Sequence, residues 1–290
     1  MRLLCDMLAM PLGERVASLL GTHLVKRTMR LFPDGEADIA LQESIEHEDV
    51  FVLSSATSTS WMPLLLLLDA LVRSRPQRIY LCFAYFGYGR QDRQMAPCGC
   101  FPVRRLAMLL GTFPLERIFI TDLHNLHNIF LFPMPCLSMS SSKIFYSYLI
   151  ERNAVPDIFV APDLGAISRA RQLAALCARP WCFLDKKAAA QKENNRLQGK
   201  RCVLIDDLVD SGRTLCHAAT VLRREGAQSI MAFATHGLFA NKEYRREIDS
   251  LLEELIVTDT LPLSPEAPVI AQQITIAPLI KELFESLCNK

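Results

Sequence analysis

The sequence lacks a strong excess of charge of either sign. It carries 32 Lys and Arg against 31 Asp and Glu, which gives a formal net charge of +1. A chain this close to neutral does not create the positive field that attracts nucleic acids or anionic membranes. The sequence also lacks an apolar run of bilayer length, because the longest one, residues 61–72, is too short and is interrupted by Asp69. We therefore expect a buried helix there, no nucleic-acid partner and no membrane span.

A secretory signal peptide and a zinc-binding pattern are also missing. Residues 1–12 carry Arg2 and Asp6 and show no cleavage pattern. Most of the ten cysteines lie in apolar runs, as reduced core thiols do. Cys98 and Cys100 form a close pair, but no second Cys or His pair at zinc spacing accompanies them, so a metal or redox role is the weaker interpretation. We expect a cytoplasmic, reducing setting.

What the chain does have is length and apolar content. Its 290 residues are more than one hydrophobic core needs, and half of them are hydrophobic, so we expect two domains. Short apolar segments with the pattern of strands alternate with helix-like segments across short links. This alternation is typical of α/β proteins in which a mainly parallel sheet is flanked by helices.

The predicted elements divide into two halves. Residues 131–142, rich in Pro and Ser, are the expected boundary, so we predict an N-terminal domain at 1–139 and a C-terminal domain at 140–290, and we leave open whether the last helix packs back on the N-terminal domain. Functional groups recur at strand ends in both halves, which favours an ancient duplication although no direct repeat is seen. The predicted strands are 39–41, 49–54, 78–83, 117–121, 157–161, 180–184, 202–205, 229–235 and 254–258, and the predicted helices are 14–20, 61–72, 103–110, 142–151, 167–178, 215–225 and 279–288.

Residues 203–215, VLIDDLVDSGRTL, carry the clearest functional pattern. An apolar run at 202–205 predicts a short buried strand, with Asp206 and Asp207 at its end. A small-residue turn follows, and then the predicted helix. A strand, a Gly-containing turn and a helix N-terminus together form an anion site, because free backbone N–H groups point at the ligand. The turn consists of Asp210, Ser211, Gly212, Arg213 and Thr214.

The two acids need a different partner from the turn. Two carboxylates repel a phosphate, so Asp206 and Asp207 suit a neutral polyol edge, such as two hydroxyls of a ribose. Ser211 and Thr214 add hydroxyl donors beside the turn. We therefore interpret the segment as a site for ribose 5-phosphate, with acids for the sugar and the turn for the phosphate. An ordinary strand-turn-helix with a polar N-cap is the alternative.

This segment resembles the phosphoribosyl pyrophosphate (PRPP) binding loop of type I phosphoribosyltransferases and PRPP synthetases. Other segments match one of these families, ribose-phosphate pyrophosphokinase or PRPP synthetase, in the order in which that family carries them. They are FPDGE, YFGYGRQDR, TDLH and APDLGAISRAR, at residues 32–36, 85–93, 121–124 and 161–171. ATH at 234–236 and TDTLPL at 258–263 fit as well. The chain thus resembles this family from about residue 32 to residue 263.

The resemblance implies two phosphoribosyltransferase-like domains, a Mg²⁺-dependent reaction and a homo-oligomer, commonly a hexamer built from dimers. In that reaction the 1-hydroxyl of ribose 5-phosphate attacks the β-phosphorus of Mg-ATP, and AMP leaves. Such chemistry relies on positioning and charge neutralisation more than on covalent catalysis. We therefore expect a ribose-phosphate diphosphokinase whose binding groups meet at the carboxyl ends of the strands.

The same resemblance assigns roles to particular residues. His124 and Asp163 help to hold Mg²⁺ with the ATP phosphates, directly or through water, whereas His127 is expected to be structural. Lys186 matches the catalytic lysine at the base of a flexible loop, where it neutralises charge on the transferred phosphates. The ATP-binding positions are Phe32, Asp34, Gly35 and Glu36, reached from a neighbouring subunit, together with Arg90, Gln91 and Arg93. The ribose-5-phosphate positions are Asp206, Asp207, Asp210, Ser211, Gly212, Arg213 and Thr214.

One position departs from the family pattern in a way that bears on activity. Ala188 stands where the family usually carries an Arg two residues after the catalytic Lys, so one phosphate-facing cation is missing. A non-catalytic, PRPP-synthetase-like regulatory subunit is therefore the first alternative. A type I phosphoribosyltransferase is the second, because it shares the loop at 203–215 and does not require the segments at 32–36 and 85–93.

Overall fold

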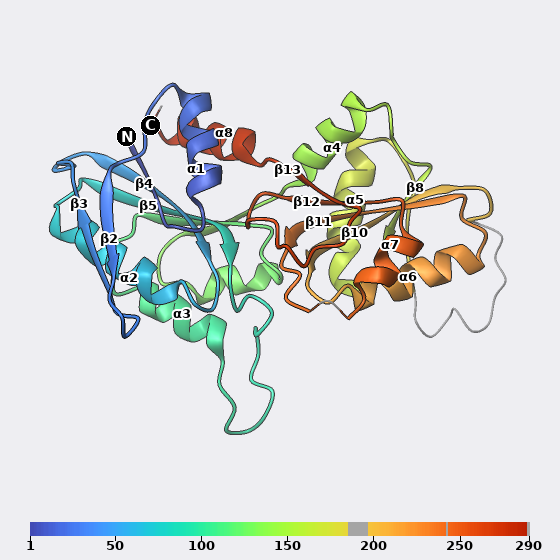
Figure 1. Cartoon of the computed structure of the whole chain (residues 1–290), viewed down its shortest axis with the longest axis horizontal. Coiled ribbons are helices and arrows are strands. Elements are labelled where there is room, and N and C mark those ends of the chain that lie inside the picture. Colours follow the sequence, from blue (N-terminus) through green and yellow to red (C-terminus); the bar gives the residue numbers. More distant parts are fainter. Residues whose placement is uncertain (185–196, 242, 289–290) are drawn as a thin grey trace. The chain divides into compact units, whose positions relative to one another are not determined.

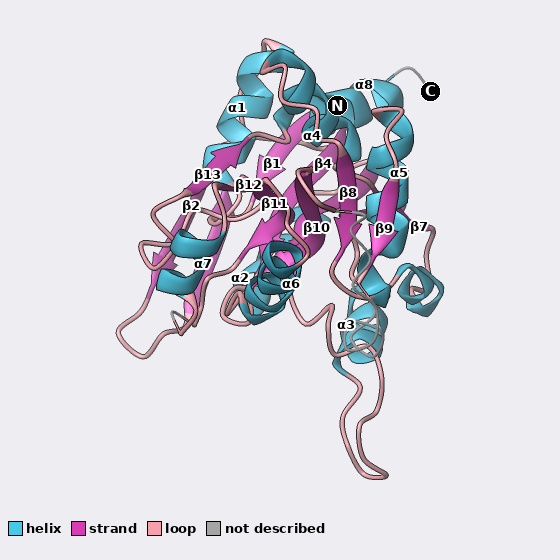
Figure 2. Cartoon of the chain, turned by 90° about the vertical axis from the view of Figure 1, so that its right-hand side faces the viewer, coloured by secondary structure: helices cyan, strands magenta, loops and turns pink. Residues whose placement is uncertain are grey.

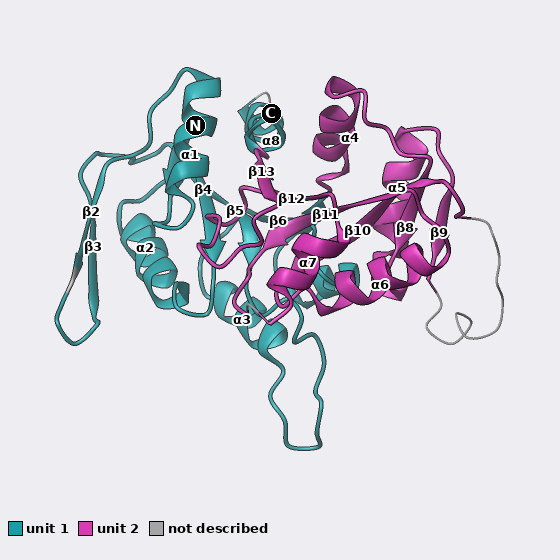
Figure 3. Cartoon of the chain, turned by 45° about the vertical axis from the view of Figure 1, so that its right-hand side comes forward, with its two compact units in different colours: residues 1–139, 277–290 teal, residues 140–276 magenta. Residues whose placement is uncertain are grey.

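The computed structural model describes residues 1–184, 197–241 and 243–288 (Figure 1). The chain forms two compact units (Figure 3): unit 1 comprises residues 1–139 and 277–290, and unit 2 comprises residues 140–276. The last helix, α8 (Ala277–Cys288), packs against α1 (Met10–Leu20) within unit 1. None of the described helices combines the length and the apolar character that a bilayer crossing requires.

Unit 1 is built on a five-stranded parallel sheet in the order β1-β4-β5-β6-β7. Because its strands all run the same way, their carboxyl ends lie at one edge. The strands are β1 (Arg2–Cys5), β4 (Asp49–Ala56), β5 (Arg78–Phe86), β6 (Arg117–Thr121) and β7 (Cys136–Met139). A separate antiparallel hairpin consists of β2 (Arg27–Leu31) and β3 (Ala37–Leu41).

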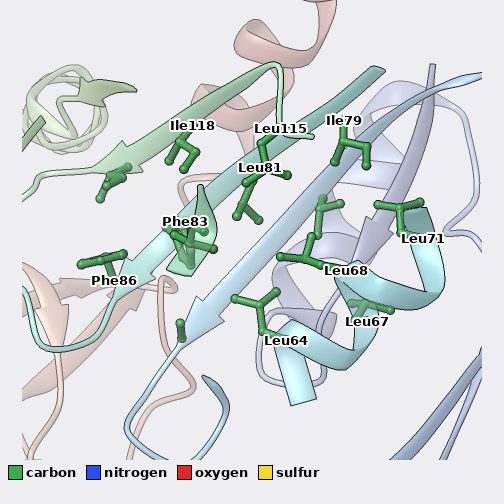
Figure 4. Packing of buried hydrophobic residues seen from close by; sticks show 14 of the residues in the cluster. Leu64, Leu67, Leu68, Leu71, Ile79, Leu81, Phe83, Phe86, Leu115 and Ile118 are labelled. Carbon is green, nitrogen blue, oxygen red and sulfur yellow. The ribbon is translucent and has the colours of Figure 1, made fainter. Parts of the chain in front are cut away.

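The core of unit 1 explains why the long apolar run forms a buried helix, as predicted. Helix α2 (Trp61–Arg73) carries leucines at the spacing of one helical face, and they pack against β5 side chains such as Phe83 (Figure 4). These leucines are Leu64, Leu67, Leu68 and Leu71. Helix α3 (Pro102–Leu110) covers the same face. Helices α1 and α8 cover the other face, where the rings of Phe51 and Phe284 lie 5.6 Å apart.

Unit 2 contains a six-stranded parallel sheet in the order β13-β12-β11-β10-β8-β9. The chain passes from β8 outward to β9 and then returns to β10 on the other side of β8. In open α/β sheets, ligands bind at the carboxyl ends of the strands beside such a switch point. The strands are β8 (Ile158–Ala161), β9 (Trp181–Phe183), β10 (Arg201–Val209), β11 (Ser229–Gly237), β12 (Glu254–Thr258) and β13 (Ala271–Ile274).

Helices cover both faces of the unit 2 sheet (Figure 2). Helices α4 (Ser142–Glu151) and α5 (Ile167–Leu176) lie on one face, and α6 (Arg213–Arg224) and α7 (Arg245–Leu251) lie on the other. The side chains of β10 alternate between them: Val203 and Ile205 pack with α4 and α5, whereas Cys202 and Leu204 pack with α6 and α7. By this alternation Asp207 continues the row that faces α5.

The predicted α/β architecture with mainly parallel sheets is confirmed. Strands β6 and β12 and helix α4 have the predicted bounds. Strands β1, β2, β7 and β13 and helix α7 are absent from the prediction, because each has seven residues or fewer and lacks a long apolar pattern. Strand β7 lies inside the Pro- and Ser-rich stretch that we interpreted as a boundary.

The prediction that Asp206 and Asp207 follow their strand is wrong. Strand β10 extends to Val209 and stays paired with β11, with Asp206 opposite Ala234. The strand continues through its polar residues because its neighbour satisfies their backbone N–H and C=O groups. For the same reason β11 includes His236, which we expected to follow the strand.

Candidate active site

The segment with the clearest sequence pattern forms a strand, a tight turn and a helix in unit 2. Strand β10 ends at Val209 and helix α6 begins at Arg213. Gly212 is the N-cap residue of α6, and it has no side chain with which to cap the helix. The hydroxyl of Ser211 accepts the N–H of Arg213 at 3.4 Å. The first N–H groups of an α-helix have no partner within the helix, so this turn presents donors to an anion.

Position 212 requires a residue without a side chain. Gly212 has a φ of 83°, in the left-handed region that glycine adopts without strain. A Cβ atom there would lie 2.2 Å from Cδ1 of Ile248, which is buried on α7. Glycine therefore lets the turn close against α7.

Two predicted acids lie next to each other on β10. Asp207 is buried and Asp206 is partly buried, and the N–H of Asp207 donates to Oδ1 of Asp206 at 2.9 Å. Burial raises the pKa of Asp206 well above its usual range, and the charges of Asp207 and Asp163 raise it further. This concentration of carboxylates suits hydroxyl groups or a cation better than an anion.

Asp163 follows β8, the strand beside β10. It caps the short 3-10 helix η2 (Leu164–Ala166), because its Oδ1 accepts the N–H of Ala166 at 3.2 Å. Its charge acts on Asp206 across the two neighbouring strands. The structure thus brings Asp163, Asp206 and Asp207 together within unit 2.

A basic residue that the sequence analysis misses belongs to this cluster. Arg169 lies on α5 with its side chain 13% exposed, and its Nη2 is 3.6 Å from Oδ2 of Asp207. Its Nη1 donates to the carbonyl oxygen of Gly165 at 2.9 Å. The segment APDLGAISRAR contained the signal, because Arg169 lies in it six residues after Asp163. An arginine on a helix is usually exposed, however, and nothing in the pattern distinguishes this one.

The segments ATH and TDTLPL form a buried polar network at the ends of β11 and β12. Nδ1 of His236 lies 2.9 Å from the hydroxyl oxygen of Thr260. The hydroxyl of Thr258 donates to the carbonyl of Thr235 at 2.6 Å, and the hydroxyl oxygens of Thr235 and Ser141 lie 2.9 Å apart. Because all five residues are buried, these contacts hold the strand ends in place.

In unit 1 the RQDR segment follows a tight turn at the end of β5. The N–H of Gly87 donates to the carbonyl oxygen of Ala56 at 2.7 Å, and a Cβ atom at position 87 would lie 2.4 Å from that oxygen. Tyr88 has a left-handed φ of 67°. The predicted ATP-binding side chains after this turn are exposed, and they are Arg90, Gln91 and Arg93.

A hydrogen bond joins the RQDR segment to the loop after β6. Nδ2 of Asn125 donates to Oδ2 of Asp92 at 2.7 Å, and Oδ1 of Asn125 accepts the N–H of His127 at 3.1 Å, at the start of the 3-10 helix η1 (Leu126–Leu131). A Cβ atom at Gly89 would lie 3.9 Å from Cβ of His124, which is exposed. The predicted ATP-binding segment and His124 are therefore neighbours within unit 1.

The FPDGE segment forms the turn of the β2–β3 hairpin. The N–H of Gly35 donates to the carbonyl of Phe32 at 2.9 Å, and the N–H of Glu36 donates to Oδ1 of Asp34 at 3.0 Å. The guanidinium of Arg30 lies 4.8 Å from the centre of the Phe32 ring. Phe32 is partly buried, whereas the other predicted adenine-binding residues are exposed within the single chain.

Lys186 and Ala188 lie outside the described residues.

Among the residues that the structure does describe, no group of three or more His, Cys, Asp and Glu is arranged to hold a metal ion. A magnesium ion that arrives with a nucleotide usually needs only one or two carboxylates besides the phosphates. A single acid such as Asp163 is therefore sufficient as a protein ligand for that kind of ion.

Comparison with known proteins decides the family. Residues 1–113 match the N-terminal domain of ribose phosphate pyrophosphokinase, and residues 186–286 match the phosphoribosyl synthetase-associated domain. Ribose-phosphate pyrophosphokinase 1 of Streptococcus pyogenes is 33% identical over 96% of this chain and 92% of that protein. The ribose-phosphate pyrophosphokinase of Helicobacter hepaticus is 32% identical over the same shares. The chain belongs to the ribose-phosphate pyrophosphokinase family.

A solved structure of this family has the same fold. The phosphoribosylpyrophosphate synthetase from Mycobacterium smegmatis matches with a TM-score of 0.89 and 29% sequence identity, over 99% of this chain and 98% of that one. The resemblance read from the ordered sequence segments is confirmed. The two alternatives, a regulatory subunit and a phosphoribosyltransferase, are not favoured, because these relatives are named as pyrophosphokinases and match nearly the whole chain.

Substitution of Gly212 tests how closely the turn packs on α7. Gly212→Ala is expected to lower the free energy of unfolding by about 1–2 kcal/mol for a left-handed alanine and by about 1–3 kcal/mol more for the contact with Ile248. Gly199→Ala is the matched control, because Gly199 has a φ of 67° and no atom within 4 Å of an added Cβ. Urea unfolding measures both variants, and equal losses would contradict the packing argument.

The pH dependence of stability tests the carboxylate cluster. Because folding raises the pKa of Asp206, the folded state holds that proton more tightly, and stability falls as pH rises through the acid range to the raised pKa. Asp206→Asn is therefore expected to raise the free energy of unfolding near pH 8 and to change it little near pH 4.

A second carboxyl, that of Asp157 directly before β8, provides a control of opposite sign. The N–H of Arg201 lowers the pKa of Asp157, so Asp157→Asn should reduce stability at neutral pH and have a smaller effect below pH 4. Urea unfolding across this pH range measures both variants. A stabilisation by Asp206→Asn that stays constant with pH would show that charge is not its cause.

Proposed function

We propose that this chain is a ribose-phosphate diphosphokinase, which transfers the β,γ-diphosphoryl group of Mg-ATP to the 1-hydroxyl of ribose 5-phosphate. A bond forms between O1 of the sugar and the β-phosphorus, the bond from the β-phosphorus to the α-phosphate oxygen of AMP breaks, and the hydroxyl proton passes to solvent. The observation that carries this proposal is the position of Asp206 and Asp207 on β10, ahead of the turn at Gly212 and helix α6, in a chain of the ribose-phosphate pyrophosphokinase family.

Ribose 5-phosphate is bound by two kinds of groups in unit 2. The carboxylates of Asp206 and Asp207 accept hydrogen bonds from sugar hydroxyls, and a charged acceptor makes these bonds strong. The 5-phosphate binds at the start of α6, where Ser211 and Thr214 add hydroxyl donors. Asp210, Gly212 and Arg213 complete the turn, which packs against Ile248 of α7 because position 212 has no side chain.

ATP is bound by groups of unit 1. Arg90 and Arg93 are exposed cations suited to bidentate phosphate contact, and Gln91 lies between them. The hydrogen bond between Asn125 and Asp92 supports this role, because it fixes the segment beside His124.

The adenine is proposed to be held by the hairpin tip of a neighbouring subunit. Phe32 offers an aromatic face there, and Asp34, Gly35 and Glu36 are exposed around it. An active site shared in this way requires a homo-oligomer, and the family pattern favours a hexamer built from dimers. The buried free thiols of Cys5 and Cys82 support a reducing, cytoplasmic setting.

The residues present fit a magnesium ion that arrives with ATP. Asp163 offers the carboxylate oxygen that Mg²⁺ prefers, and His124 is proposed to contact the ion through water or a phosphate. Burial raises the pKa of Asp206, and the charges of Asp207 and Asp163 raise it further, so a nearby cation would favour its ionised form. When bound, Mg²⁺ neutralises charge on the phosphates. Lys186 is proposed to neutralise charge on the transferred phosphates as the bond to AMP breaks.

An assay of AMP formation tests the proposal. The purified chain is expected to produce AMP from Mg-ATP only when ribose 5-phosphate is present, and PRPP should accumulate in equal amount. Lys186→Ala is expected to reduce the rate by about 100-fold or more, as the loss of a charge-stabilising group does. If the wild-type chain forms no more AMP than Lys186→Ala does, it is not a diphosphokinase.

Separate substitutions test the division of substrates between the units. Asp207→Ala or Asp206→Asn is expected to raise KM for ribose 5-phosphate about tenfold or more, because a charge-assisted hydrogen bond is lost, and to change KM for ATP less. Arg90→Ala should do the reverse.

Residues outside the proposed site provide the controls for this division. Asp157→Asn and Arg75→Ala serve here, because Asp157 precedes β8 and Arg75 precedes β5, whereas the proposed site lies at the carboxyl ends of the strands. Both variants are expected to leave the two KM values unchanged. Effects of equal size on the two substrates would refute the division.

A further inference from the structure

We infer that Arg169 is a positioning residue, which orients the Asp207 carboxylate for the ribose hydroxyls and joins the Asp163 turn to the sugar-binding strand. This inference rests on the proposed function and deepens it, because it concerns how the ribose 5-phosphate site is assembled. No ATP- or sugar-binding role was predicted for Arg169 from the sequence.

The contacts of Arg169 link two strand ends. Its Nη2 lies 3.6 Å from Oδ2 of Asp207 on β10, and its Nη1 donates to the carbonyl of Gly165 at 2.9 Å. Gly165 lies in the turn that Asp163 caps after β8. One guanidinium group therefore contacts both the turn after β8 and the acid on β10, and its planar, forked donors suit such a double contact.

Burial makes this ion pair different from a pair on the surface. The side chain of Arg169 is 13% exposed and that of Asp207 is 8% exposed. By contrast, the side chains of the Arg73–Asp69 pair on α2 are 78% and 55% exposed. Exposed pairs contribute little because water and salt screen them, whereas removal of one partner from a buried pair leaves an uncompensated charge.

The charges around Asp207 explain why a cation is needed there. Asp206 on the same strand and Asp163 at the end of β8 are acids, and their proximity disfavours further negative charge. Strand β11 brings buried His236 and the neutral Thr235 to this edge, α6 begins with the exposed Arg213, and α5 also carries the exposed Arg171. Arg169 is the cation that α5 brings into contact with the acid itself.

Asp207 must stay ionised and oriented to accept sugar hydroxyls. Without the guanidinium, the Asp207 carboxylate loses the positive charge beside its Oδ2 and becomes harder to ionise. Loss of Arg169 should therefore weaken the binding of ribose 5-phosphate selectively. ATP binding, which the proposed function assigns to other residues, should change little.

Steady-state kinetics of Arg169→Gln test this inference. The variant is expected to raise KM for ribose 5-phosphate about tenfold or more, as loss of one partner of a close buried charge pair does, with KM for ATP changed by less than about twofold. The acid limb of kcat/KM for ribose 5-phosphate should move to higher pH. Arg169→Lys, which keeps the charge and loses the fork, should give an intermediate KM.

Arg171→Gln is the matched control, because Arg171 lies on the same helix and is exposed. It should leave both KM values and the pH profile unchanged. If Arg169→Gln does not fold, Arg169→Lys decides alone, and an unchanged KM for ribose 5-phosphate in that variant overturns the inference.

A double-mutant cycle distinguishes a positioning role from direct contact with substrate. In an Asp207→Asn background, Arg169→Gln should change KM for ribose 5-phosphate by less than about twofold, because its target is already neutral. Additive effects, or a larger effect on KM for ATP, would show that Arg169 acts on a substrate directly and would overturn the inference.

All variants are compared with an active wild-type chain. An inactive wild type would refute the proposed function itself, whereas an active wild type with an unaltered Arg169→Gln refutes only this inference.

Discussion

Crowding of carboxylates at one edge of the unit 2 sheet is the constraint on which the site depends. Asp206 and Asp207 are neighbours on β10, and Asp163 lies at the end of the adjacent strand. Buried carboxylates are unfavourable unless donors or a cation compensate them. Backbone N–H groups and Arg169 provide part of that compensation. The proposed ligands, a sugar with several hydroxyl groups and a divalent cation, are suited to provide the remainder.

The parallel sheets explain why the polar groups gather where they do. Both faces of each sheet are covered by helices, and side chains along β10 alternate between two apolar layers. Parallel strands buried on both faces leave their ends as the places where polar side chains are tolerated. Unit 1 follows the same rule with different residues, because the RQDR segment and His124 follow β5 and β6. The shared arrangement agrees with the idea of a duplicated α/β unit.

Much of this organisation was predictable from the sequence, because strong apolar runs determine α2, β6 and β12 locally. The turn at Gly212 was predictable from its residue types, because small polar residues favour a helix start and glycine adopts a left-handed backbone without strain. The short strands β7 and β13 were not, because their pairing with neighbouring strands creates them. The position of Asp206 and Asp207 inside β10 has the same origin. Arg169 escaped detection because its burial depends on the contact between α5 and β10, which no local pattern records.

The contact between Gly212 and Ile248 has an evolutionary consequence. Ile248 belongs to helix α7 and to the apolar core of unit 2, and its Cδ1 occupies the space where a Cβ atom at position 212 would lie. A bulkier side chain at 248 would push the turn outward, and a smaller one would loosen it. A substitution at this core residue would thereby change the position of the turn before α6, so we expect positions 212 and 248 to vary together among related sequences.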